Sequence, residues 1–320
     1  MKVLKIFCLA VVVAGLIWSV PGFAQSITSG DIAGVVTDPS GAVIPNAKVT
    51  AKNDATGALE AATTNGEGFY RFSFLQVGSY TVTVNAAGFQ PGSRKIQVTV
   101  AQTVNGNIGL AVTAATTTVE VTTTAVQAET ASVVTTFSAE QVSLVPNPGN
   151  DLSAIAQTSP GVVMNTQGGF GNFSTNGLPG TSNLFTVNGM NDNDPFLNLN
   201  NSGATNLLLG ANDVQEVTVV NNGYSGQYGQ LAGSQINYVT KSGGNQWHGN
   251  AIYQWNGRAL NANDYRNNFQ VQDTPSLPRA FDNVNQWAAG LNGPIKKDKT
   301  FFSWNYEGLR VVLPTQATNL

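Results

Sequence analysis

The chain has little charge and almost no cysteine or histidine. Aspartate, glutamate, lysine and arginine make up 10% of its 320 residues, the formal net charge is −3, and no block of basic residues occurs. Soluble domains contain about 25% charged residues, and nucleic-acid-binding proteins carry clustered basic side chains. The composition therefore argues against a cytoplasmic α/β enzyme and against nucleic acid as a partner.

The N-terminus has the pattern of a secretory signal. Lys2 and Lys5 precede an apolar run over residues 6–20, and the segment that follows ends on a small residue, Ala24. A membrane-spanning helix needs about 20 apolar residues, so we predict a cleaved signal peptide over residues 1–24. Because Cys8 is the one cysteine, the exported chain would have neither a disulfide nor thiolate chemistry.

Residues 28–112 consist of short alternating runs separated by turn residues. The expected strands are 32–37, 47–51, 68–74, 79–84 and 95–100, with turns at 38–41, 65–68 and 87–88. Alternation of polar and apolar residues is typical of sheets with one buried face, so we predict a small Greek-key β-sandwich. Four aromatic residues of these strands are expected in the core or on a sheet face, not in a ligand platform: Tyr70, Phe72, Phe74 and Tyr80.

The same segment resembles a carboxypeptidase regulatory-like domain. The matching positions are Gly34, Asp38, Gly41, Ala47, Val49, Gly66, Gly68, Tyr70, Phe72, Gly78, Tyr80, Gly88 and Phe89. The resemblance implies a transthyretin- or Ig-like β-sandwich of the carbohydrate-binding-like fold group. Such a fold does not by itself establish sugar binding.

A second set of matches lies between residues 214 and 261, and it resembles the end of the plug and the first barrel strand of a TonB-dependent outer-membrane receptor. The matching positions are Gln215, Glu216, Val217, Tyr224, Tyr228, Gly229, Gly233, Thr240, Lys241, Ser242, Gly243, Asn245, His248 and Gly249. The resemblance implies a plug over residues 138–245 that occludes the lumen of a β-barrel, with residues 240–243 as the hinge between them. Matches at 293–295, 300–302 and 306–310 are typical of the Oar-like subgroup of these receptors.

The expected plug is a mixed α/β domain. Ser138 and Gln141 have the spacing of a capping box at the start of a short helix, and residues 151–157 predict a second short helix. Strands are expected at 185–189 and 211–220. Asn188 stands where the family usually has aspartate, and both residue types favour turns.

Residues 246–320 have the alternation of barrel strands that face lipid on one side and a wet lumen on the other. The residues expected to face lipid are Trp247, Gly249, Ala251, Tyr253, Trp255, Trp287, Ala289, Leu291, Phe302, Trp304 and Tyr306. The residues expected to face the lumen are His248, Asn250, Gln254, Asn256, Gln286, Asn292, Ser303, Asn305 and Glu307. A long connection, 257–283, and a short one, 293–299, fit an outer loop and a periplasmic turn.

Receptors of this kind have about 22 barrel strands, and these residues predict about three of them. We therefore expect an N-terminal fragment without a complete pore. Its short barrel sheet is expected to be curved and to pack poorly against the plug.

Nothing in the sequence predicts catalysis, a cofactor or a metal. His248 is the one histidine, and no nucleophile motif accompanies it. Residues 191–194 have calcium-like spacing, but Leu197 and Gly203 occupy the positions where a calcium loop needs glycine and glutamate. A solvated plug loop is the preferred interpretation.

Two further hypotheses concern binding. Val119, Glu120, Val121 and Thr122, in the linker over residues 113–137, are a candidate strand for a TonB-type energy-transducing protein, because strand addition relies on main-chain hydrogen bonds. An ordinary linker strand is the alternative interpretation. The residues expected to face a ligand from the outer plug loops are Asn165, Gln167, Phe170, Phe173, Asn191, Asp192 and Asp194.

The sequence as a whole predicts a mainly β protein of the Gram-negative outer membrane with its sandwich in the periplasm. The predicted function is TonB-dependent, ligand-gated uptake. Its expected partners are a TonB-type protein, outer-membrane lipid, and a small-molecule, sugar or peptide ligand that the sequence does not identify. The alternatives are a surface adhesion or carbohydrate-binding protein that uses the barrel as an anchor, and an enzyme with the sandwich as an accessory module.

Overall fold

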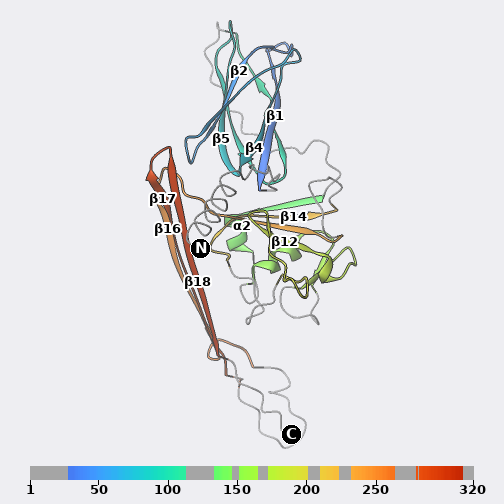
Figure 1. The fold of residues 1–320 in the computed structure, drawn as a ribbon, viewed down its shortest axis with the longest axis vertical. Helices are drawn as coiled ribbons and strands as arrows, with labels where there is room; N and C mark the ends of the chain where they lie inside the picture. The colour runs from blue at the N-terminus through green and yellow to red at the C-terminus, as the bar shows by residue number, and fades with distance from the viewer. Residues whose placement is uncertain are drawn as a thin grey trace, which may run out of the picture.

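The computed structural model describes residues 28–112, 133–145, 151–164, 172–200, 210–222, 232–263, 279 and 281–312. The expected signal peptide, the candidate strand 119–122, and Asn165, Gln167 and Phe170 lie outside these residues. Figure 1 shows three parts: a β-sandwich at one end, a plug beneath it, and a tall three-stranded sheet beside the plug. Among the described residues, no helix is both long and apolar enough to cross a membrane.

The sandwich consists of two sheets that share one core. One sheet has the order β4-β1-β7, with β8 also paired to β1, and the other has the order β3-β2-β5-β6. The strands are β1 (Ser29–Thr37), β2 (Lys48–Asn53), β3 (Leu59–Thr63), β4 (Phe69–Gln76), β5 (Gly78–Asn85), β6 (Gly92–Val98), β7 (Thr103–Asn105) and β8 (Ile108–Gly109). All five expected strands are present. The sequence missed β3 because its side chains are almost all exposed, so it lacks a buried alternate face.

The sandwich core follows from the alternation of its strands. Ile32 and Val36 of β1 and Val82 and Val84 of β5 are completely buried. Tyr70 and Phe72 meet edge to face with their ring centroids 5.7 Å apart, a favourable aromatic geometry. The Tyr70 hydroxyl donates to the main-chain oxygen of Gly106. Burial raises the pKa of Tyr70 far above its usual value, so this hydroxyl stays a hydrogen-bond donor.

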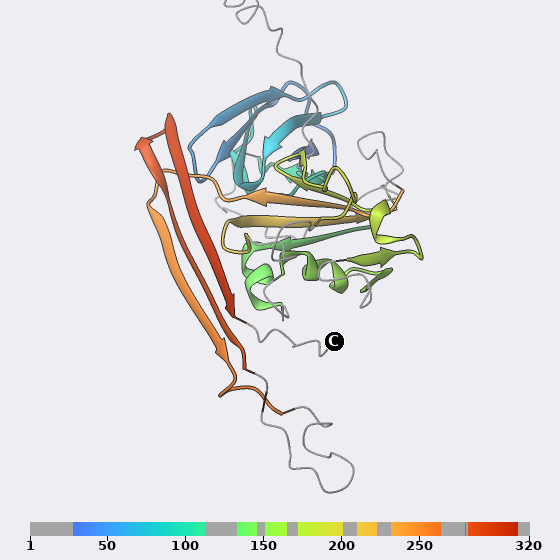
Figure 2. The same cartoon turned by 60° about the horizontal axis from the view of Figure 1, so that its bottom comes forward.

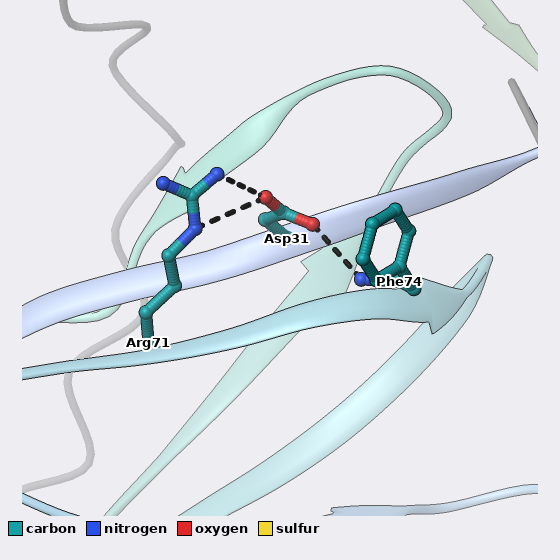
Figure 3. A network of polar contacts seen from close by, with 3 residues as sticks. All are labelled: Asp31, Arg71 and Phe74. Atoms are coloured by element: carbon teal, nitrogen blue, oxygen red, sulfur yellow. Dashed lines mark hydrogen bonds and ion pairs between the residues drawn. The ribbon is translucent and has the colours of Figure 1, made fainter. Parts of the chain in front are cut away.

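Phe74 departs from the alternation of β4. It has a φ of 59° and its side chain is 68% exposed, whereas its neighbour Leu75 is buried. Figure 3 shows that Asp31 accepts from the Phe74 main-chain nitrogen at 3.0 Å and from the Arg71 guanidinium, whose Nε is 3.2 Å away. A bulge between Gly30 and Ile32 of β1 lies opposite. Tyr70, Phe72 and Tyr80 are thus core residues, while Phe74 projects from the surface.

The plug is built on a mixed five-stranded sheet with the order β13-β12-β15-β14-β9. These strands are β9 (Val133–Ser138), β12 (Leu184–Val187), β13 (Met190–Asn191), β14 (Val214–Asn221) and β15 (Gln235–Thr240), and β12 pairs with β15 in parallel. A separate hairpin joins β10 (Val162–Met164) to β11 (Phe173–Thr175). The expected strands around 185 and 214 are confirmed, and β9 shows that the sheet begins before Ser138.

The short helices of the plug begin where the sequence predicted them. Helix α2 (Ala139–Leu144) has Ser138 as its N-cap, and both hydrogen bonds of the capping box with Gln141 are present. The second is a 3₁₀ helix, η2 (Leu152–Thr158), with Asp151 as its N-cap. A third, η3 (Gly180–Ser182), was not expected. The apolar residues of η2 pack with Val217 and Ile236 of the sheet in a second core.

The plug sheet has one apolar and one polar face, because side chains alternate along each strand. Phe185, Ile236 and Val219 lie at one level of the apolar face. On the opposite face, Thr186, Asn237, Thr218 and Thr136 follow one another across four strands. Thr186, Asn237 and Thr218 are nevertheless buried, and the Thr186 hydroxyl donates to Asn237 Oδ1 at 2.6 Å. The polar face therefore requires a cover.

The third part is an antiparallel sheet of three strands in sequence order. They are β16 (His248–Gly257), β17 (Asn283–Lys296) and β18 (Thr300–Val312). They are long enough for strands of a membrane barrel, which need about 9–11 residues. Figure 2 shows the sheet bowed beside the plug, as expected for a piece of barrel wall.

The register of this sheet separates its two faces as predicted. On the outer face, Gly249, Leu291 and Trp304 are direct neighbours, and Trp304 is exposed. On the inner face, Ile252, Ala288 and Glu307 are neighbours, and Ala288 is buried. The inner face is covered only in part, because every residue of β16 except Gly257 is exposed. The expectation that this short sheet packs poorly against the plug is confirmed.

Asp31 holds the unusual backbone of Phe74, and its replacement should destabilise the sandwich. Asp31→Ala leaves the Phe74 N–H without its acceptor, and we expect the free energy of unfolding to fall by about 1–3 kcal/mol. Arg71→Ala is the matched control, because Arg71 is half exposed and exposed ion pairs contribute about 0–1 kcal/mol. Urea unfolding of both variants tests this. Equal losses would show that the ion pair, not the main-chain bond, stabilises the bulge.

Candidate functional site at the plug–barrel junction

Asn212 connects the plug to the inner face of the barrel sheet. It lies in the turn before β14 and is buried. Its Nδ2 donates to Asn305 Oδ1 of β18 at 2.6 Å, and its Oδ1 accepts from the Nδ2 of Asn250 on β16. Both barrel residues belong to the predicted lumen face, so the plug lies on that side of the sheet.

Lys241 holds the same turn from the hinge side. Its Nζ donates to the main-chain oxygen of Asn212 at 2.7 Å, and its main-chain nitrogen donates to the Asp213 oxygen at 2.7 Å. Burial lowers the pKa of Lys241, and the nearby Asp213 carboxylate partly opposes this shift. Burial in turn raises the pKa of Asp213. The lysine therefore fixes the start of the hinge to the turn that contacts the barrel.

Asn245 lies in the segment that leads from the plug into β16, and it contacts both the sandwich and the barrel turn. Its main-chain nitrogen donates to the oxygen of Ala55 in the sandwich at 2.8 Å. Its Nδ2 donates to Thr56 O at 3.0 Å and to Asp298 Oδ1 at 2.7 Å. Its Oδ1 accepts from the Asp298 main-chain nitrogen at 2.8 Å. Asp298 belongs to the short turn between β17 and β18, so one side chain joins the sandwich to the barrel turn.

Glu216 forms a second contact between sandwich and plug. Its carboxylate accepts from the main-chain nitrogen of Val100 at 2.8 Å and from the Thr218 hydroxyl at 3.1 Å. Nearby, Gln102 of the sandwich donates to the Thr136 hydroxyl at 3.2 Å. Glu216 is buried, and no cationic side chain pairs with it in the described part of the chain. Burial therefore raises its pKa.

The predicted ligand-facing residues have different environments. Phe173 is buried in the plug core, where it meets Phe185 edge to face at 5.6 Å. This corrects its prediction: β11 turns the ring inward to pack, so it is closed to a ligand. Asp194 accepts from the main-chain nitrogens of Phe196 and Leu197 at 2.8 and 2.6 Å, and Asn191 accepts from that of Asn193 at 2.8 Å. These two residues shape their loop.

Strand β13 and the loop after it present exposed apolar side chains that were not among the predicted site residues. Phe196 is 91% exposed, and Met190 and Leu197 are also exposed. Asn193 fixes the loop from inside, because it accepts from the main-chain nitrogen of Phe185 at 2.7 Å and donates to Asn183 O at 2.8 Å. Asp192 is exposed as a residue, although neighbouring atoms partly bury its carboxyl and raise its pKa. The sequence did contain a signal for this surface: the apolar residues Phe196 and Leu197 follow closely after the polar run 191–194.

No metal or catalytic arrangement accompanies these contacts. In the described ranges, no group of three histidine, cysteine, aspartate or glutamate residues could hold a metal ion. His248 is exposed at the start of β16. The geometry therefore centres on contacts between domains.

Three family models match the chain in succession. Residues 31–111 match the carboxypeptidase regulatory-like domain, residues 126–234 the TonB-dependent receptor plug domain, and residues 239–320 the outer membrane β-barrel domain. These domains in this order are those of a TonB-dependent outer-membrane receptor, and the chain is an outer-membrane protein.

One relative is the TonB-dependent transporter Oar of Myxococcus xanthus, which is 29% identical to this chain over 309 residues. The match covers 91% of this chain and 27% of Oar, so the chain spans about a quarter of that relative's length.

Two solved outer-membrane proteins match part of the chain. The siderophore receptor PirA from Acinetobacter baumannii is 20% identical, with a TM-score of 0.39 over 55% of this chain and 24% of PirA. The outer membrane transporter YddB from Escherichia coli is 15% identical, with a TM-score of 0.42 over 57% of this chain and 26% of YddB.

Glu216 should make the stability of the chain depend on pH. Because its pKa is raised in the folded chain, folding favours the protonated form. The free energy of unfolding should therefore rise as the pH falls from the raised value toward the ordinary glutamate pKa of about 4.3. Glu216→Gln keeps an oxygen for the Val100 N–H but carries no charge. We expect this variant to be more stable at neutral pH and to lose this part of the pH dependence.

The measurement is urea unfolding of wild type and Glu216→Gln across the acid-to-neutral range. Asp192 and Asp213 also have raised pKa values, so the difference between the two proteins isolates Glu216. Parallel stability curves would contradict the assignment.

Proposed function

We propose that the chain is the periplasmic and plug-bearing part of a receptor that takes up a ligand across the outer membrane with energy from a TonB-type protein. One observation carries the proposal: the buried Asn212 of the plug is hydrogen-bonded to the lumen-facing residues of two barrel strands. This contact supports a plug that lies inside the wall and closes it. We propose no enzymatic activity, because the matched relative is a transporter and a plug domain is present.

The outer face of the barrel sheet is suited to lipid. Trp247, Tyr253, Trp304 and Tyr306 are exposed on it, and Trp247 stacks edge to face with Phe302 at 5.4 Å. Aromatic residues on the outside of a barrel lie near the two membrane interfaces. Some rings cover glycines of neighbouring strands: an added Cβ on Gly308 would lie 2.5 Å from Trp287. The surface supports direct contact with outer-membrane lipid.

The residues proposed to bind the energy-transducing partner remain Val119, Glu120, Val121 and Thr122. They precede β9, the edge strand of the plug sheet, so a pull on them would reach the plug first at this edge. On the ligand side, we propose that the loop shaped by Asn191, Asp192 and Asp194 contacts a small-molecule, sugar or peptide ligand through Met190 and Phe196. Asn165, Gln167 and Phe170 remain proposed for the same role.

Proline substitutions test the partner strand. Residues two apart direct their N–H groups to the same strand edge, and proline lacks the N–H. Val119→Pro/Val121→Pro and Glu120→Pro/Thr122→Pro therefore block one edge each. We expect one of these pairs to weaken binding to the purified C-terminal domain of the organism's TonB-type protein by about tenfold or more, as loss of two main-chain hydrogen bonds requires.

The controls for this binding test are Val119→Ala/Val121→Ala and Glu120→Ala/Thr122→Ala, which change side chains only. Isothermal titration calorimetry should give near-wild-type affinity for both. Binding that survives both proline pairs would place the partner strand elsewhere. A wild-type chain that does not bind the domain at all would overturn the proposed function.

Charge on the outer face should prevent membrane insertion. Trp304→Arg places an arginine toward lipid, at a cost of about 2–4 kcal/mol near the bilayer midplane. Ser303→Arg is the matched control, because Ser303 is the adjacent residue and belongs to the inner face. With both substitutions made in a full-length receptor that has a closed barrel, we expect loss of membrane-inserted protein only for Trp304→Arg. Flotation and protease protection in phospholipid vesicles measure the insertion. Equal insertion of the two variants would contradict a lipid-facing Trp304.

A further inference from the structure

The sandwich contacts the plug and the barrel at the same time. At one place its loop between β2 and β3 meets Asn245 and Asp298, and at another Val100 and Gln102 meet the plug sheet. Figures 1 and 2 both show the turn between β17 and β18 at the sandwich end of the molecule. A body attached to both sides of a junction resists relative movement of those sides.

The sandwich loop at this junction is held in shape by its own hydrogen bonds as well as by the contact. Asn53, buried at the end of β2, accepts from the main-chain nitrogens of Ala55 and Thr56 at 2.9 and 3.0 Å. Its own main-chain oxygen accepts from Gly57 at 2.8 Å, which closes the turn. Because the loop's own hydrogen bonds restrict it, less conformational entropy is lost when Ala55 and Thr56 accept their bonds from Asn245.

The three parts approach one another closely at this junction. A Cβ on Gly57 would lie 2.7 Å from Asp298 Oδ1, and a Cβ on Gly244 would lie 3.0 Å from Ala55 O. Gly57 has a φ of 77°, a conformation that glycine adopts without steric cost. Close packing of this kind between three domains makes separation an all-or-none event, because small displacements already lose the contacts.

The second contact covers the polar face of the plug sheet. Glu216, Thr218 and Asn237 on this face are buried, and the sandwich supplies the Val100 N–H to Glu216 and the Gln102 amide to Thr136. The plug cannot move toward the sandwich end while the sandwich remains there. In sequence, residues 113–132 lie between the sandwich and β9 of the plug, so a pull on this segment acts on both.

We propose that the sandwich is a clamp that locks the plug to the barrel and must leave the junction before the plug can move. This proposal rests on the proposed function and describes how that function is regulated. The pull from the energy-transducing protein would first release the sandwich and then displace the plug. Asn245 is the residue through which the clamp holds both sides, and Glu216 is its second attachment.

A disulfide across the junction tests the clamp. The Cβ of Ala55 lies 3.5 Å from the position of a Cβ on Gly244, within the range of about 3.5–4.5 Å for a disulfide. Ala55→Cys/Gly244→Cys, made without Cys8, would fix the sandwich to the hinge when oxidised. The receptor is held in a lipid bilayer and pulled by force spectroscopy through a covalent peptide tag inserted between residues 113 and 132.

We expect the wild-type protein to show sandwich release followed by plug extension. The oxidised Ala55→Cys/Gly244→Cys protein should lose the plug-extension events that follow release of the sandwich. Reduction of the disulfide with dithiothreitol should restore these events. The single variants Ala55→Cys and Gly244→Cys control for the tight space at Gly244 and should behave as wild type under oxidant. Identical force–extension traces for the oxidised and reduced pair would overturn the clamp.

Asn245→Ala gives the opposite perturbation and needs no cross-link. It removes three side-chain hydrogen bonds at the junction, and we expect sandwich release to be about tenfold faster at a given force, which corresponds to about 1.4 kcal/mol. An unchanged release rate would overturn the role of Asn245. Both measurements use the covalent tag, so they report on the clamp whether or not the chain binds a TonB-type protein.

Discussion

The junction between plug and barrel is held by neutral amide side chains, and the arrangement of the three domains depends on this choice. Asn212 and Asn245 each donate and accept at the same time, which a carboxylate or an ammonium group cannot do. Amides leave water at a smaller cost than ions, whose desolvation often exceeds their attraction. Hydrogen bonds between amides fix the orientation of the two surfaces, and they can still break when the domains separate.

The charged side chains Lys241 and Glu216 at the domain contacts bind main-chain atoms. Lys241 reaches a main-chain oxygen instead of a carboxylate, and Glu216 accepts from a main-chain nitrogen without a cationic partner. A chain with 10% charged residues thus uses its buried charges to hold backbone, and burial shifts the pKa of each toward the neutral form. Lys241 also interacts electrostatically with the nearby Asp213 carboxylate, while the ion pair found within the described ranges, Arg71 with Asp31, lies in the sandwich.

Much of the fold followed from alternation and caps, because these depend on neighbouring residues only. The alternation around Tyr253, Trp287 and Trp304 predicted both faces of the barrel sheet, and Ser138 with Gln141 predicted the start of α2. The predictions failed where contacts between segments distant in sequence determine the position of a side chain. Phe74 faces outward because Asp31, on another strand, holds its backbone. Phe173 is buried because Phe185 and η2 build a core around it. Asn245 was noticed only as a match to a family, since its role requires Ala55 and Asp298 to be brought beside it.

The turn at Asn188 gives the plug a further property. Asn188, with a φ of 49°, accepts from the Thr240 main-chain nitrogen at 3.0 Å and donates to the Thr240 hydroxyl at 2.9 Å. Thr240 is the last residue of β15, directly before Lys241, and Met190 follows Asn188 by two residues. The turn that leads to the exposed Met190 is therefore hydrogen-bonded directly to the start of the hinge. Because Asn188 bonds both the main-chain nitrogen and the hydroxyl of Thr240, a displacement at Met190 changes the geometry at the hinge.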